Sequence, residues 1–208
     1  TIEEIRADPN LFKSALDDIQ DNDEHAAAAV SANPNLFEHV SPRLRGNMLL
    51  AMTAVMFNGE LLEFASPQVK NNMDMVILAV DQNGAALRFA SERMRNNETV
   101  VVRAVSQLGV AIQYASDELR ELFYINVVAV RQNWLALEFI ANEWRNDRTL
   151  MRIALKQSTI ASRFLSDTLM IEYAQTGTIA ADDQLIVVPA TTQVSPKYIA
   201  GLFSRWWY

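Results

Sequence analysis

The 208-residue sequence contains no cysteine. Disulfide bonds, cysteine nucleophiles and thiolate-bound metal ions are therefore excluded. The absence of cysteine is consistent with a protein that works in the cytosol. Histidine is almost as rare, with only His25 and His39 in the whole chain.

Basic charge and long apolar runs are also scarce. The chain has 18 Lys and Arg residues against 25 Asp and Glu residues, which gives a formal net charge of -7. Because the phosphates of nucleic acids and anionic lipids attract basic surfaces, this balance disfavours nucleic acid and an anionic membrane as partners. No apolar run approaches the ~18 residues of a membrane span, and no signal peptide is visible. The chain begins at Thr1 rather than at Met, as expected of a fragment or a processed form.

Motifs that carry chemistry are missing as well. There is no P-loop, no dinucleotide-binding glycine pattern and no serine in a Gly-x-Ser-x-Gly context. His25 follows two acidic residues without the i, i+4 spacing of a helical metal site, which favours the acidic first turn of a helix. The pair Asp182-Asp183 lacks further ligands at metal-binding spacing and is typical of a solvated loop. We therefore name no catalytic, cofactor-binding or metal-binding residue and expect no cofactor.

What the sequence does contain is a repeat with a period of 25 residues. Six copies open at an apolar residue, namely Ile19, Leu44, Val69, Met94, Leu119 and Trp144. Ten residues after each opening residue stands an alanine, namely Ala29, Ala54, Ala79, Ala104, Ala129 and Ala154. Twenty residues after it, five copies have an aromatic residue and the first has His39. Leu11 and Phe12 match Leu36 and Phe37, so a partial copy precedes the six.

Each copy has the periodicity of short helices. Val76, Ala79 and Val80 form an i, i+3, i+4 apolar stripe, and Asn72 is a good N-cap for it. The glycine shared by three copies, represented by Gly84, predicts a left-handed C-terminal cap. A second, shorter helix is predicted over 85–90. A third helical turn over 91–95 follows a serine N-cap.

Such short helices bury their apolar stripes only by stacking copy on copy. The pattern predicts an all-α protein, an α-solenoid of six 25-residue helical repeats with a partial N-terminal copy and a C-terminal capping helix. We divide the chain into a partial repeat (1–18), six repeats (19–168) and a non-repeat cap (169–208). The constant alanine indicates a place where two helices approach closely.

The repeat resembles the family called domain of unknown function 4116. The likeness is clearest over 69–97, where Gln82, Asn83, Gly84, Phe89 and Ser91 are in register with the family pattern. This family has no established activity, and its repeats are frequent in large proteins that intracellular bacterial pathogens inject into host cells. The resemblance implies a helical repeat and the context of a bacterial virulence effector. It also implies a location in the cytoplasm, or in a host cytosol reached without a classical signal peptide.

Two rows of polar residues run along the predicted solenoid. The first is a cationic row, in which a basic residue follows each opening residue after the first copy, namely Arg45, Lys70, Arg95, Arg120 and Arg145. One interpretation is a track for phosphate or acidic peptides; the favoured one is that each cation neutralises a helix start or binds loop carbonyls. The second row is a glutamine before the glycine turn, which we expect to form hydrogen bonds between copies rather than to bind a partner.

Tryptophans mark breaks in the pattern. Trp134 replaces the turn glycine in the fifth copy, and two interpretations stay open: an exposed interface anchor, or packing on a neighbouring loop. Beyond residue 169, an apolar run over 185–188 predicts a strand or extended segment. From Tyr198 onward the spacing of apolar residues predicts an amphipathic helix that ends near Trp206 and Trp207, which serves as a cap or binds a partner.

Three functions are compatible with these features. We favour a protein-interaction module in a bacterial effector, with an unknown and possibly host partner. The first alternative is the accessory or substrate-positioning region of an enzyme whose catalytic groups lie in the C-terminal segment or outside this chain. The second is an anion-binding module that uses the cationic row. The candidate partner-binding residues are Trp134, the five cations of the row, Trp206 and Trp207, while the oligomeric state is left open.

Overall fold

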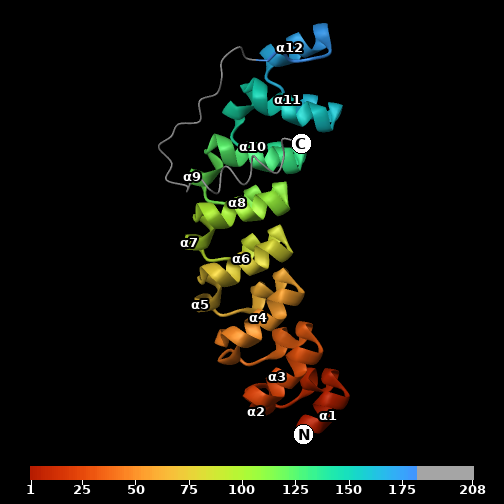
Figure 1. The fold of residues 1–208 in the computed structure, drawn as a ribbon, viewed down its shortest axis with the longest axis vertical. Helices are drawn as coiled ribbons and strands as arrows, with labels where there is room; N and C mark the ends of the chain where they lie inside the picture. Colours follow the sequence, from red (N-terminus) through yellow and green to blue (C-terminus); the bar gives the residue numbers. More distant parts are fainter. Residues whose placement is uncertain (182–208) are drawn as a thin grey trace, which may run out of the picture.

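The computed structural model describes residues 1–181 of the chain. These residues form an elongated stack of helical layers that runs from the N-terminus to the last helix, α12 (Figure 1). No β-strand occurs among them. The all-α class and the helical repeat arrangement are thereby confirmed.

Each copy contributes one long helix, one 3₁₀ helix and one short helical segment. The long helices are α3 (Asp23–Ala32), α4 (Met48–Phe57), α6 (Met73–Gln82), α8 (Glu98–Gln107), α10 (Phe123–Gln132) and α11 (Arg148–Gln157). The 3₁₀ helices that follow them are η2 (Pro34–His39), η4 (Gly59–Phe64), η5 (Gly84–Phe89), η6 (Gly109–Tyr114), η7 (Trp134–Glu138) and η9 (Thr159–Phe164). The short segments that precede the long helices are α2 (Asp17–Gln20), η3 (Leu44–Gly46), α5 (Pro67–Lys70), α7 (Glu92–Arg95), α9 (Asp117–Arg120) and η8 (Asn142–Asn146).

The ends of the helices are set by side-chain caps, as the sequence indicates. The Asn72 side chain accepts a hydrogen bond from the Met75 backbone N–H, 3.0 Å away, at the start of α6. The Ser91 hydroxyl does the same for Met94 at the start of α7. These bonds satisfy N–H groups that a helix leaves free at its first turn and thereby stabilise the starts of α6 and α7.

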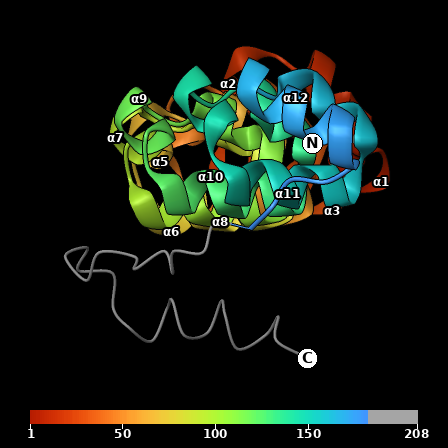
Figure 2. The same ribbon diagram turned by 90° about the horizontal axis from the view of Figure 1, so that it is seen from above.

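Consecutive long helices lie side by side along one face of the stack, and consecutive 3₁₀ helices lie next to one another as well (Figures 1 and 2). The repeated alanine of every long helix is fully buried between these two rows. The next position along each helix is also apolar, so one continuous core runs through all the layers. No copy has a core of its own, as in other solenoids.

The turn glycines do not have the conformation that the sequence suggested. Gly59, Gly84 and Gly109 stand at the start of a 3₁₀ helix, and among the described residues only Gly177 has a positive φ. A β-carbon on Gly84 would lie 2.5 Å from the carbonyl oxygen of Ala104 in the next copy. The prediction of a left-handed cap is therefore wrong: glycine is required because the next layer's backbone occupies the space of a side chain.

The glutamine row bridges adjacent copies, which confirms that prediction. The backbone N–H of Gly84 donates to Oε1 of Gln107, 2.6 Å away, and that of Gly109 donates to Oε1 of Gln132, 2.5 Å away. The amide of Gln132 in turn donates to the carbonyl of Gln107 at 3.0 Å. Gln107 and Gln132 thus each satisfy a buried backbone donor at the start of the preceding 3₁₀ helix.

The two ends of the described part depart from the regular copy. At the N-terminus, α1 (Ile2–Ala7) and η1 (Pro9–Ser14) pack on α3 and η2, with Phe12 fully buried. At the other end, α12 (Asp167–Thr176) runs on for ten residues through Glu172, the position at which the other copies end their short segment and begin the long helix. It stops at Gly177, which has φ +71°. The segment predicted over 185–188 and the helix predicted from Tyr198 to Trp206 lie outside the described residues.

Candidate interaction surface

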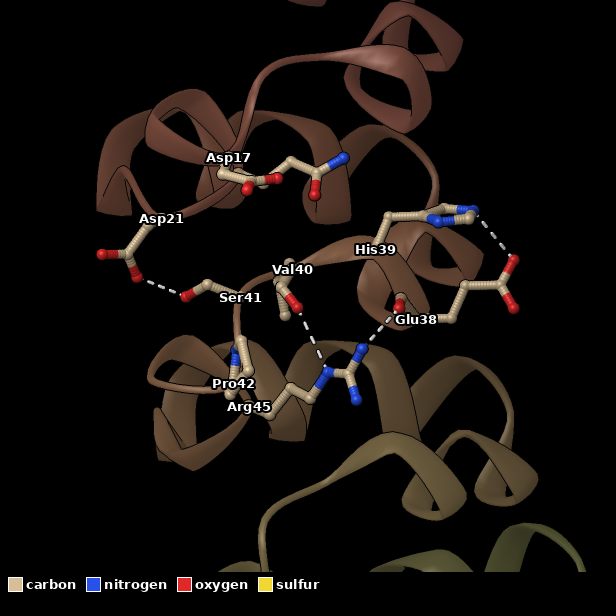
Figure 3. A pocket seen from close by; sticks show the side chains of 9 residues that line it. Asp17, Asp21, Glu38, His39, Val40, Ser41, Pro42 and Arg45 are labelled. Atoms are coloured by element: carbon tan, nitrogen blue, oxygen red, sulfur yellow. Dashed lines mark hydrogen bonds and ion pairs between the residues drawn. The ribbon is translucent and has the colours of Figure 1, made fainter.

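The first candidate is a pocket near the N-terminus, with a volume of about 480 Å³ (Figure 3). His39 is its one histidine, and its Nε2 lies 3.0 Å from the carboxylate of Glu38. The Ser41 hydroxyl donates instead to the carboxylate of Asp21, the C-cap residue of α2. Figure 3 shows His39 and Ser41 directed toward different partners. The pocket therefore does not pair a hydroxyl nucleophile with a histidine base.

The contact between Ser41 and Asp21 is one example of a structural pattern. Ser91 donates to Asn71 at 2.7 Å, and Ser116 donates to Asn96 at 2.6 Å, each from the N-cap of one short segment to the C-cap residue of the short segment before it. The hydrogen bond from Ser41 also lowers the pKa of Asp21, assisted by the nearby Arg43 guanidinium. The same serine contact recurs with an asparagine amide in place of the carboxylate. We therefore interpret it as a contact that holds layers together rather than one that carries catalytic chemistry. Among residues 1–181, no group of three acidic or histidine side chains is arranged to hold a metal ion.

The cationic row lies on one edge of the stack, and all five of its side chains are half-buried. Arg45 donates to the carbonyls of Val40, at 3.1 Å, and Glu38, at 2.9 Å (Figure 3). Arg120 forms an ion pair with Asp117 and donates to the Phe139 carbonyl at 3.5 Å.

The remaining members of the row are Arg145, Lys70 and Arg95. Arg145 lies over the ring of Phe164, with 5.4 Å between its guanidinium carbon and the ring centroid. Burial lowers the pKa of Lys70. Arg95 is half-buried like the others. The geometry favours a role for the row in joining copies rather than in forming a free track that binds anions.

Trp134 is half-buried, because it packs on the following copy. Its ring centroid lies 6.3 Å from that of Phe164, and the Arg163 guanidinium carbon lies 5.5 Å from the Trp134 centroid. Its backbone N–H donates to Gln157 at 3.0 Å, just as the turn glycines donate to their glutamines. Trp134 thus packs on η9 of the following copy, a 3₁₀ helix rather than the loop that the second interpretation named. Trp206 and Trp207 lie outside the described residues.

The side chains that remain without a structural role gather on α4. This helix contains no charged residue, and Thr53 is its one hydrogen-bonding side chain. Leu49 is 67% exposed, Met56 is 56% exposed and Phe57 is 62% exposed. Met48 and Met52 are exposed beside them, and Met73 of α6 extends the patch toward the next layer. We call the exposed side chains of Met48, Leu49, Met52, Met56 and Phe57 the α4 face.

The other copies serve as internal controls for the α4 face. The position of Leu49 is held elsewhere by hydrogen-bonding residues, namely Glu24, Asp74, Thr99, Tyr124 and Thr149. The position of Met56 is likewise held by Ser31, Asp81, Ser106, Arg131 and Lys156. Five copies therefore fold with polar side chains at these two places. Packing does not require Leu49 and Met56 to be apolar.

Phe57 departs from the pattern for a reason that the structure makes clear. It takes the position of the bridging glutamine, and the backbone that it would bridge to belongs to Pro34. Proline has no N–H to donate, so a glutamine has no bond to make there. The same holds in the first copy, where Ala32 stands 23 residues after Pro9, but only at Phe57 does this position carry an exposed aromatic ring.

The positions where the copies agree do not reveal the α4 face. The signal was present at positions where one copy differs: two apolar residues at places that are polar in five other copies. Large exposed apolar patches are unusual on soluble proteins and mark interaction sites. The other exposed large apolar side chains of residues 1–181 lie toward the two ends of the stack, at Leu11, Leu16, Ile160, Met170 and Ile171.

Comparison with known proteins gives the family of the repeats. A family model described as Domain of unknown function (DUF4116) matches four overlapping or successive segments, 26–70, 47–95, 72–120 and 128–170, which together cover more than half of the chain. No curated protein and no solved structure matches the chain. No helix within residues 1–181 is long and apolar enough to cross a membrane.

Proposed function

The chain belongs to the family described as Domain of unknown function (DUF4116), and from this starting point we propose that it is a protein-interaction module whose binding surface is the α4 face. The observation that carries the proposal is the pair Leu49 and Met56. Both are largely exposed, and both are apolar where five other copies are polar. An apolar side chain in water that the fold does not need is explained by a partner that covers it.

The shape of the fold supports the same function. A stack of layers presents a long row of helices to solvent, and solenoids use such extended surfaces to bind other proteins. The pocket near the N-terminus pairs no nucleophile with a base, and three members of the cationic row, Arg45, Arg120 and Arg145, contact groups of their own chain. Of these three surfaces, the α4 face is the one whose exposed side chains are least explained by contacts within the chain.

Site-specific photocrosslinking tests this proposal. A benzophenone amino acid would replace Met52, on the α4 face, or Val102, which occupies the same position on α8. We expect a crosslinked partner from position 52 and none from position 102. The crosslink should also be lost when Leu49, Met56 and Phe57 are changed to the Thr, Ser and Gln of α8. A crosslink from position 52 that persists after these three changes would show that the binding surface lies elsewhere.

We further propose that the module forms part of a bacterial effector that acts in a host cell. The support is the family resemblance, since such repeats are frequent in proteins that intracellular bacterial pathogens inject into host cells. A translocation reporter fused to the full-length protein measures this directly. Reporter signal in host cytosol is the expected result, and signal confined to the bacteria would contradict it.

A further inference from the structure

One layer toward the N-terminus from the α4 face lies a hollow. Helix α3, the next layer toward the N-terminus, carries Ala27 and Ser31 at the positions of Met52 and Met56. These small side chains leave an open depression of about 740 Å³ between α1 and α3, lined by Ile2, Arg6, Glu24, Ala27, Ala28, Ser31 and Ala32. No α4 side chain lines this hollow; α3, which carries the small side chains, lies between it and the large apolar side chains of α4.

Large side chains on α4 next to small side chains on α3 form a surface that fits an amphipathic helix. A partner helix lying over α3 would place its own large apolar side chains over Ala27 and Ala28 and its flank against Leu49 and Met56. Exposed methionines suit such a surface, because the flexible thioether adapts to the shape of what it contacts. Half of the chain's eight methionines lie here, as Met48, Met52, Met56 and Met73.

The free charges around the α4 face are acidic. Glu24 on α3 and Asp74 on α6 share the repeat position of Leu49 and are exposed on either side of it. Neither forms an ion pair within residues 1–181, whereas the nearby Asp23 is paired with Arg43 and Asp81 with Arg103. Two unpaired carboxylates that flank an apolar strip favour an apolar partner with basic flanks.

We propose that the α4 face and the hollow between α1 and α3 bind an amphipathic helix of another protein that carries lysine or arginine on its flanks. This inference rests on the proposed function and adds the chemistry of the partner. A second copy of the chain fits less well, because a two-fold contact between α4 faces would place Glu24 and Asp74 against the same carboxylates of the other copy. The same acidic flanks oppose an anionic lipid surface.

Two designed peptides test the inference. Both are 18-residue amphipathic helices with the same leucine face; one has lysine and the other has glutamate at the polar positions. Titration calorimetry with the full 208-residue chain should show that the lysine peptide binds at least about tenfold more tightly than the glutamate peptide, which corresponds to about 1.4 kcal/mol. Added salt should weaken binding of the lysine peptide alone.

Variants locate the binding. The change of Leu49, Met56 and Phe57 to Thr, Ser and Gln should weaken binding of the lysine peptide about tenfold or more, since it removes the apolar contacts. The double variant Glu24→Gln/Asp74→Asn should weaken binding of the lysine peptide about threefold or more and reduce the salt dependence of that binding. The control Glu121→Gln/Glu143→Gln removes the same net charge from exposed positions in distant copies and should leave the affinity unchanged.

Other outcomes would overturn the inference. Equal affinity for both peptides, still lost in the triple variant, would show an apolar site without charge selection and would leave the proposed function intact. A dimer in sedimentation that the triple variant dissociates would identify a second copy as the occupant. Absence of binding to either peptide by a monomeric chain would reject the basic helix, while the photocrosslinking result would still decide the proposed function separately.

Discussion

A β-carbon placed on Gly84 would stand 2.5 Å from the carbonyl oxygen of Ala104, in the next copy of the repeat. The layers therefore touch through backbone at this point. We expect Gly84→Ala to lower the free energy of unfolding by about 1–3 kcal/mol, because the two layers must move apart to admit the methyl group. Urea denaturation followed by circular dichroism measures the change.

Gly46→Ala is the matched control for this substitution. A β-carbon on Gly46 would meet only the Ser66 side chain, at 3.5 Å and 3.8 Å, which is ordinary contact. We expect a change within about 0.5 kcal/mol, or a small gain in stability from the stiffer unfolded chain. Equal losses from Gly84→Ala and Gly46→Ala would contradict the close approach of the layers.

The glutamine bridges give a second prediction. Gln132→Leu leaves the Gly109 backbone N–H without its acceptor, and an unpaired buried donor costs about 1–3 kcal/mol. The thermal midpoint should fall accordingly in differential scanning calorimetry. Gln82 occupies the same repeat position and has no such bond to Gly59 within the described residues, so Gln82→Leu should change stability by about 0.5 kcal/mol or less. Similar effects of the two substitutions would argue against bridging.

A third prediction concerns acid stability of the last two described helices. The Arg148 guanidinium donates to the Glu172 carboxylate at 2.8 Å, and the Ala180 backbone N–H donates to it at 2.7 Å. These bonds, first from Arg148 and then from Ala180, lower the pKa of Glu172 below its ordinary value. The stabilisation is therefore complete above the unfolded-state pKa of about 4.3 and is lost as pH falls through the folded-state pKa.

Urea unfolding from about pH 7 to about pH 3 checks this prediction. Glu172→Gln should be less stable than the parent chain at neutral pH, and the two should converge at the acid end. Glu143→Gln, at an exposed position, should follow the parent chain throughout. A constant difference between Glu172→Gln and the parent chain across the whole range would mean that the carboxylate charge has no part in the effect.

The sequence was sufficient to predict the helical repeat and the glutamine bridges, because both depend on features that recur in phase. The asparagine and serine caps were predictable for a similar reason: a cap acts within a few residues of itself. The role of Gly84 was not, since a glycine allows a positive φ and a close backbone approach equally well. Only the position of Ala104, twenty residues away, distinguishes the two.

Two further points needed the stacked layers. Trp134 stands at a turn position, and only the following copy's Phe164 and Arg163 show why it is half-buried. The α4 face could have been found by comparing copies for differences at Leu49 and Met56. The hollow one layer away was not predictable, because it depends on how α1 closes the first layer against α3.

The most direct test of the account is the affinity of the chain for the partner captured at position 52, measured with purified proteins. Burial of each large apolar side chain contributes about 1.5–3 kcal/mol, so the triple variant with the Thr, Ser and Gln of α8 should bind at least about tenfold more weakly. Its free energy of unfolding should stay within about 1 kcal/mol of the parent, because α8 folds with these residues. Equal affinity of a folded triple variant and the parent chain would contradict the central claim that the α4 face is the binding surface.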